Sequence, residues 1–312
     1  MDIAEPLLAA HRARFAAVDA LLPPAAPPAD GERLDAAAAD GTQVTGVLQR
    51  QRFAPGDVPM LWSAADTWQL FPYVGDTGTE GVDLLLRALK GRLESEETAE
   101  TGDDSACVVV WPSRDAEAIR AFLDHGLVPL SAVGVRTAPP GEADPADPTV
   151  TVRRAGPGDY TVALELAEAT FDYTGLVASV RRANTAELLG PSLRKALAED
   201  TPAVWLAEED GEARALAHCA WVDAVPGNEA AELLPPGRWG YVNNVVTTPG
   251  ERGGGFGRAL MDHVHRELHR GGATRTYLYY NPTNPLSSVF WHRQGYRPLW
   301  TTWEVRPASA LR

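Results

Sequence analysis

A run of glycines between a strand-like segment and a helix-like segment constrains the fold of this chain more than any other feature. Residues 245–260 read VVTTPGERGGGFGRAL. Tyr241–Thr247 contains several β-branched residues, and Phe256–His269 has apolar residues at helical spacing. Consecutive glycines permit positive φ angles and let backbone N–H groups approach an anion, and the positive end of the helix dipole adds to this attraction. We therefore expect a strand–turn–helix unit that binds a pyrophosphate, with Arg252 and Arg258 beside it.

Two common phosphate-binding patterns do not fit this turn. The dinucleotide-binding pattern G-x-G-x-x-G/A fails because Gly255 and Gly257 are followed by Leu260. The P-loop pattern fails because no Gly-Lys-Ser/Thr follows the glycines. A different type of phosphate loop is required.

The residues that remain resemble a known family. The pattern Arg252-x-x-Gly255-x-Gly257 is similar to the acyl-CoA loop Q/R-x-x-G-x-G/A of the GNAT acetyltransferase superfamily. Further along, Asn284-x-x-Ser287-x-x-x-Trp291-x-x-x-Gly295-Tyr296 resembles that family's second motif, N-x-x-A-x-x-x-Y-x-x-x-G-F. The resemblance covers residues 149–312, and the expected order of strands and helices agrees with it.

The resemblance implies an acetyl-CoA site between the strands Tyr241–Thr247 and Arg275–Tyr280. Backbone groups of Val245 and Thr247 would pair with the pantetheine arm, and an N–H near Val246 would stabilise the thioester oxyanion. Asn284 would contact the pantetheine chain. The cofactor-binding residues implied in this way are Val245, Val246, Thr247, Arg252, Gly253, Gly254, Gly255, Phe256, Gly257, Arg258, Asn284, Ser287 and Trp291.

The catalytic groups depart from the family pattern. Trp291 stands where the family usually has a tyrosine, and an indole N–H cannot act as a practical acid. We take Tyr280 as the substitute acid, and Trp291 either packs against the cofactor or donates a hydrogen bond to the thiolate. The strand before the loop has no Asp, Glu or His, so we expect a base that acts through a water held by Asn244 or a remote group. Asn243 and Asn244 are adjacent, so we expect at most one of them to face the cleft.

Other polar and aromatic residues have simpler interpretations. Asp172 and Glu304 are candidates to bind an ammonium group, although an exposed surface carboxylate is the simpler reading of each. His265 and His269 share a helix face without an acidic partner, so we expect a solvated face and no metal site. Trp300 and Trp303 are expected in the core, with the wall of an acceptor pocket as the alternative.

The first half of the chain contains a partly altered copy of the second motif. A shift of 169 residues places it on Asp115-x-x-Ala118-x-x-x-Phe122-x-x-x-Gly126. The Gly, Pro and Leu of residues 126–130 then coincide with those of residues 295–299. In the corresponding loop, residues 76–81, an aspartate replaces Arg252 and carboxylates would face the pyrophosphate. We therefore expect a degenerate half that does not bind CoA.

We predict an α/β fold with a mixed sheet, built as tandem GNAT-like domains. The degenerate domain is residues 1–137, the Pro-rich linker 138–148 and the catalytic domain 149–312. The whole chain has a net charge of −14, and residues 1–150 carry 11 basic and 24 acidic side chains. This acidity disfavours nucleic-acid binding, and no apolar run is long enough to span a membrane. Two cysteines and no evident signal peptide favour a cytoplasmic protein, and a homodimer is one oligomeric state left open.

The function expected is acetyl transfer from acetyl-CoA to a primary amine by direct attack in a ternary complex. The acidic first half favours a small cationic acceptor, such as an amine metabolite, an antibiotic-like compound or a lysine-bearing peptide. Two alternatives stay open: a transferase of related fold that uses aminoacyl-tRNA, and a non-catalytic acyl-CoA sensor or scaffold. The intact loop and the acidic surface argue against the first, and Trp291 with the missing base makes the second plausible.

Overall fold

The computed structural model describes residues 3–95, 102–141, 149–177, 180–201 and 203–312. Residues 142–148 of the expected linker lie outside the described residues. Among the described residues, every helix is too short or too polar to cross a bilayer.

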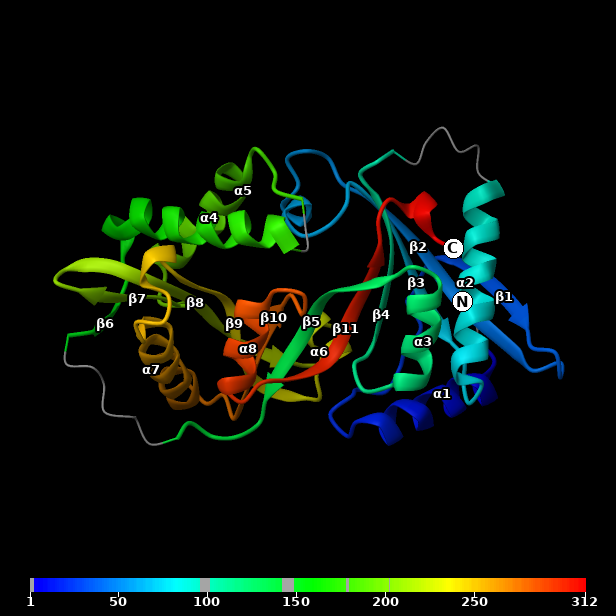
Figure 1. The fold of residues 1–312 in the computed structure, drawn as a ribbon. Helices are drawn as coiled ribbons and strands as arrows, with labels where there is room; N and C mark the ends of the chain where they lie inside the picture. Colours follow the sequence, from blue (N-terminus) through cyan, green and yellow to red (C-terminus); the bar gives the residue numbers. More distant parts are fainter. Residues whose placement is uncertain (1–2, 96–101, 142–148, 178–179, 202) are drawn as a thin grey trace. The chain divides into compact units, whose positions relative to one another are not determined.

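The described chain forms two compact units. The first combines Met1–Ala132 with Gly227–Pro235 and Pro298–Arg312, and the second combines Val133–Pro226 with Pro236–Arg297. Each unit is a mixed sheet covered by helices (Figure 1). This confirms the predicted α/β class with a mixed sheet.

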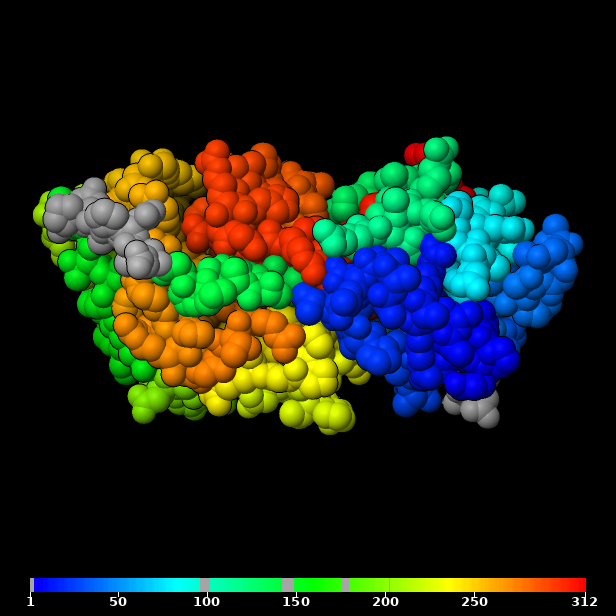
Figure 2. Space-filling view, turned by 90° about the horizontal axis from the view of Figure 1, so that it is seen from below, coloured from blue at the N-terminus to red at the C-terminus, as the bar shows by residue number. Residues whose placement is uncertain are grey.

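The first unit is built on strands that change direction once. Strands β1, β2 and β3 are antiparallel, β3 and β4 are parallel, and β11 adds antiparallel to β4. These strands are β1 (Glu32–Ala37), β2 (Gln43–Arg52), β3 (Asp66–Tyr73), β4 (Ser105–Pro112) and β11 (Arg297–Val305). The helices are α1 (Glu5–Val18), α2 (Gly78–Ser95), α3 (Ala116–Asp124) and the short α6 (Glu229–Leu233). Figure 2 shows α1, in blue, on the surface of this unit.

Aromatic side chains hold β11 in the core of the first unit. Trp303 of β11 stacks on Phe122 of α3, with ring centroids 5.5 Å apart, and Phe122 meets Trp111 of β4 edge-on. Trp300 lies against Phe15 of α1 and donates a hydrogen bond of 2.8 Å to the main chain of α6. Both tryptophans are buried, which confirms the expected core role.

The second unit has the same strand arrangement on a larger scale. Strands β6 to β9 are antiparallel, β9 and β10 are parallel, and the end of β5 lies next to β10. The strands are β5 (Val128–Arg136), β6 (Thr151–Arg154), β7 (Ala203–Glu209), β8 (Glu212–Ala224), β9 (Gly237–Thr247) and β10 (Arg275–Tyr280). The helices are α4 (Tyr160–Val177), α5 (Thr185–Ala198), α7 (Phe256–Arg270) and α8 (Pro285–Arg293).

The two units share an order of elements but exchange their last strands. In the first unit α2 joins the parallel strands β3 and β4, and in the second α7 joins β9 and β10. The strand after α3, however, ends in the second unit, and the strand after α8 pairs in the first. The compact units therefore do not follow the expected boundaries at residues 137 and 149, because β11 finds its antiparallel partner in β4. The common order supports the tandem arrangement, which stays a proposal.

One expectation about the helix after the glycines is wrong. His265 of α7 is only 4% exposed, and its Nε2 lies 2.9 Å from the hydroxyl of Tyr296. That hydroxyl also lies 2.8 Å from the Thr276 hydroxyl of β10. His265 therefore belongs to a buried polar network that ties α7 to β10, whereas His269 on the next turn is exposed as expected. The spacing of residues along the helix does not show that the Tyr296 hydroxyl can form a hydrogen bond with the His265 imidazole.

Candidate functional site

The candidate site lies where β9 and β10 stop pairing. Their parallel ladder runs from Trp239 opposite Arg275 to Val242 opposite Leu278. Beyond it, β9 continues through Thr247 while paired on its other side with β8. Among the described residues, no strand therefore pairs with the β10-facing edge of Val245–Thr247. Backbone groups on such an edge can accept an extended ligand as an added strand.

A β-bulge in β9 reorganises the side chains at this point. The β8–β9 register pairs His218 with Asn244 and Cys219 with Val242, so Asn243 is an extra residue. Asn243 lies 3.1 Å from the His218 ring, and Asn244 accepts a hydrogen bond of 3.0 Å from Thr170 of α4. Both amides therefore lie on the face of the sheet that α4 covers. The expectation that at most one would do so is wrong, because the bulge interrupts the alternation of strand side chains.

A polar and aromatic cluster surrounds the bulge. The hydroxyl of Tyr241 donates to Asn243 Oδ1 at 3.0 Å, and Asn243 Nδ2 meets Nδ1 of His218. The Tyr241 ring stacks on Tyr277 of β10, with centroids 4.7 Å apart, and Tyr279 lies edge-on at 6.2 Å. We name Tyr241, Asn243, His218, Tyr277 and Tyr279 the bulge cluster.

His218 is the residue that the sequence analysis missed. Burial lowers its pKa to about 4, so the imidazole is neutral at pH 7 and can accept a proton. It lies on β8, and nothing in the pattern of that strand distinguishes it from a packed histidine. Only the register with β9 brings it to the two asparagines.

The glycine loop has the geometry of an anion site. Gly253 and Gly255 have φ angles of 92° and 86°, which favour glycine, and α7 begins at Phe256. Gly255 caps the helix without a side-chain hydrogen bond, so the first N–H groups of α7 have no intrahelical partner. Arg252 is exposed, with its guanidinium 5.0 Å from the Tyr173 ring centroid. Arg258, also exposed, lies on the first turn of α7. These donors fit a pyrophosphate.

The second motif forms the start and the inner face of α8. Asn284 caps this helix, because its Oδ1 accepts from the backbone N–H groups of Leu286 and Ser287, each at 3.1 Å. Trp291 is 7% exposed and meets the Tyr296 ring at 5.4 Å. The contacts of Trp291 are packing contacts, and those of Asn284 leave only its Nδ2 donor for a ligand.

Tyr280 lies on the other side of β10 from the bulge cluster. Tyr277 and Tyr279 share one face of this strand with Tyr241, and Tyr280 therefore points to the opposite face. There it meets His292 of α8 at 6.1 Å. Burial raises the pKa of the Tyr280 phenol, so the phenol keeps its proton at neutral pH.

Neither candidate carboxylate for an ammonium group is found at the bulge cluster. Glu304 is 5% exposed in the first unit, where Arg306 donates to it at 2.6 Å. Burial raises the pKa of this carboxyl. Asp172 forms an ion pair with Arg181 on the surface of the second unit, as the simpler reading expected. Among the described residues, no group of His, Cys, Asp and Glu could hold a metal ion.

In the first unit, the loop that corresponds to the glycine loop has its space occupied by side chains. Thr77 donates to the carbonyl of Val74 at 2.7 Å, and a Cβ on Gly81 would lie 2.0 Å from the Thr77 hydroxyl. A Cβ on Gly78 would meet the carboxylate of Glu117 at 2.9 Å. The guanidinium of Arg14, 3.4 Å from the same position, is already paired with Glu117 and Asp115. Glu80 in the first turn of α2 adds a further negative charge, which makes this helix start unfavourable for a pyrophosphate.

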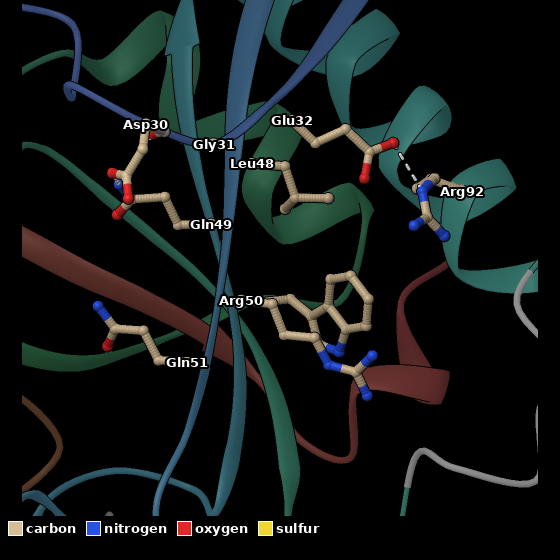
Figure 3. Close-up of a pocket in the computed structure, with 9 residues that line it drawn as sticks. Asp30, Gly31, Glu32, Leu48, Gln49, Arg50, Gln51 and Arg92 are labelled. Atoms are coloured by element: carbon tan, nitrogen blue, oxygen red, sulfur yellow. Dashed lines mark hydrogen bonds and ion pairs between the residues drawn. The ribbon is translucent and has the colours of Figure 1, made fainter.

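The first unit contains a cavity of about 490 Å³ at the other end of α2 (Figure 3). Its two arginines are already paired. Arg50 donates to Asp66 at 2.6 Å while lying 4.1 Å from the Trp68 ring centroid, and Arg92 donates to Glu32 at 2.7 Å. Because these charges are compensated, this cavity does not replace the missing phosphate loop.

Comparisons with known proteins concern the family and the fold. Residues 167–296 match the model of the acetyltransferase (GNAT) family. A GCN5-related N-acetyltransferase from Sphaerobacter thermophilus aligns over 90% of this chain and 82% of its own, with 16% identity and a TM-score of 0.55. This likeness shows a shared fold. No curated protein matches the chain.

Two further structures align with lower scores. A GCN5-related N-acetyltransferase from Kribbella flavida covers 97% of this chain and 95% of its own, with 15% identity and a TM-score of 0.44. A predicted acetyltransferase from Clostridium acetobutylicum, solved with acetyl-CoA, covers 47% of this chain and 90% of its own, with 20% identity and a TM-score of 0.38.

Reversal of one charge in the loop tests the anion site. We expect Arg252→Glu to weaken CoA binding about tenfold or more, because a like charge at close range costs about 1–4 kcal/mol. Isothermal titration calorimetry with CoA measures the change. Arg120→Glu, an equal charge reversal on an exposed helix of the first unit, is the control and should leave the affinity unchanged. Equal affinities of the wild type and Arg252→Glu would contradict the assignment.

Proposed function

Residues 167–296 belong to the acetyltransferase (GNAT) family, whose members use acetyl-CoA, and we propose that the second unit acetylates a primary amine of a small cationic molecule. The bulge cluster beside the open edge of β9 is the observation that carries this proposal. It combines aromatic faces with a neutral imidazole at the point where β9 and β10 diverge.

The residues proposed to hold acetyl-CoA form two groups. The backbone of Val245 and Thr247 pairs with the extended pantetheine arm, and the N–H groups of Gly253–Arg258 with the Arg252 side chain bind the pyrophosphate. When bound, acetyl-CoA supplies the acetyl group that is transferred to the amine, and the CoA thiolate is the leaving group. Val246 is 7% exposed, and a backbone N–H near it donates to the carbonyl oxygen as negative charge develops.

The acceptor approaches from the α4 side. Tyr241, Tyr277 and Tyr279 present ring faces and edges there, and a cation over such a ring is attracted by about 0.5–2 kcal/mol. We therefore propose that rings and amides orient the ammonium group and that the acidic composition of the whole chain, with a net charge of −14, attracts it over longer distances.

Proton transfer is divided between the two faces of the sheet. His218, neutral above a pKa of about 4, accepts the proton that the amine must lose, directly or through a water held by Asn243 and Asn244. On the opposite face, Tyr280 donates a proton to the departing thiolate, and Trp291 packs against Tyr296. Cys107 and Cys219 are buried, and burial raises the pKa of each thiol to about 12, so neither serves as a nucleophile.

Release of free CoA in the presence of amines tests the proposed function. Thiol release from acetyl-CoA is followed with primary amines of net charge 0, +1 and +2 at low and high ionic strength. We expect kcat/KM to rise with acceptor charge and this advantage to shrink with added salt. Acetyl-CoA binding without thiol release for any amine would instead support a sensor or scaffold. Equal kcat/KM and equal salt dependence for all amines would contradict the cationic acceptor.

Replacement of His218 tests the base. His218→Ala should lower kcat about 10²-fold or more, the usual range for general base catalysis, without weakening CoA binding. His269→Ala, which removes an exposed histidine of α7, is the matched control and should retain full activity. The pKa of His218 is about 4, so His218 stays neutral as the pH falls through 6.5. A loss of activity near pH 6.5 in the wild type should therefore not be caused by His218, and His218→Ala should not remove it. An unchanged kcat in His218→Ala would exclude this role.

A further inference from the structure

A second cavity in the second unit lies away from the glycine loop. It has a volume of about 200 Å³, and its lining includes Arg136 at the end of β5, Asp262, His265 and Arg266 of α7, and Arg293 of α8. The glycine loop leads into the first residue of α7, whereas these α7 residues lie on its second and third turns. We name Arg136, Arg266, Arg293 and His265 the arginine pocket.

The guanidinium groups of the arginine pocket outnumber the carboxylates that line it. The guanidinium of Arg136 donates only to main-chain carbonyls, those of Gln294, Ala138 and Pro139, at 2.7–3.1 Å. Arg266 and Arg293 have no hydrogen bond or ion pair with any residue that the structure describes. Asp262 is the one carboxylate in the described lining. Three guanidinium groups around one small cavity repel one another unless an anion is bound.

His265 adds a polar atom of a largely buried side chain to this cavity. Its side chain is more than nine-tenths buried, and its Nε2 is used by the Tyr296 hydroxyl. The other ring nitrogen, Nδ1, has no partner among the described residues, although the ring lines the cavity. Burial first, and then the charges of Arg136 and Arg266, lower the pKa of this imidazole to about 3. In the tautomer whose Nε2 accepts from the Tyr296 hydroxyl, the neutral ring carries its proton on Nδ1 and can donate to an anionic oxygen.

We propose that the arginine pocket binds a compact dianion of the phosphate class, either inorganic phosphate or the phosphate group of a monoester. Guanidinium groups match phosphate oxygens in bidentate geometry, and three of them with a ring N–H exceed what a monoanion requires. The volume is below the ~300–1,000 Å³ of pockets for drug-sized ligands, which favours a single phosphate group. Main-chain hydrogen bonds hold Arg136 in place before the ligand arrives.

Calorimetric titration with inorganic phosphate tests the proposal on the full chain. The wild type should bind one phosphate, and the double variant Arg266→Gln/Arg293→Gln should bind it at least tenfold more weakly. Arg270→Gln is the matched control, because Arg270 lies on the same helix but is paired with Glu267 outside the pocket. Its affinity should stay within twofold of the wild type. Circular dichroism establishes that all variants are folded.

Two results of this titration overturn the proposal. They are absence of phosphate binding by the folded wild type, and equal binding by the double variant. Repetition with saturating CoA then separates the two anion sites: phosphate should still bind with the same affinity. Displacement of phosphate by CoA would show that the pocket is part of the cofactor site and would also overturn it. Titration with a phosphate monoester shows which form of phosphate the pocket prefers. Tighter binding of the monoester than of inorganic phosphate identifies the monoester as the ligand, and weaker binding identifies inorganic phosphate.

Discussion

One extra residue in β9 determines how the second unit can work. Without Asn243 as a bulge, β8 and β9 would keep strict alternation, and Asn244 would not lie opposite His218 on the face that α4 covers. The bulge brings Asn243 and Asn244 to one face, and it lies where the ladder between β9 and β10 ends. Its position therefore links an open strand edge, suited to an extended ligand, with a polar cluster suited to an amine.

The two faces of the sheet at this point differ in chemistry. On the α4 side lie tyrosine rings and the neutral imidazole of His218, and on the α8 side lie Tyr280 and Trp291. A reaction that removes a proton from one reactant and returns one to another benefits from such a separation, because the base and the acid do not neutralise each other. The glycine loop completes the arrangement by providing N–H groups between the end of β9 and the start of α7.

Local features were predictable from the sequence, and long-range pairings were not. The glycine run, helix α7 and strand β10 follow from composition and periodicity, and two spaced motifs predicted the acetyltransferase family of the second half. The pairing of β11 with β4 was missed, because strand periodicity does not identify the partner strand. His218 was missed for the same reason, since a bulge and its register appear only when β8 and β9 are paired. Burial of His265 depends on Tyr296, which lies 31 residues away along the chain.

We propose that acetyl-CoA binds at the start of α7 and not at the corresponding start of α2. The start of α7 has glycines with positive φ and an arginine, whereas the start of α2 is filled by Thr77 and faced by Glu117. The stoichiometry of acetyl-CoA binding, measured by calorimetry on the full chain, tests this difference most directly. We expect one molecule per chain. Two molecules per chain, or none, would contradict it.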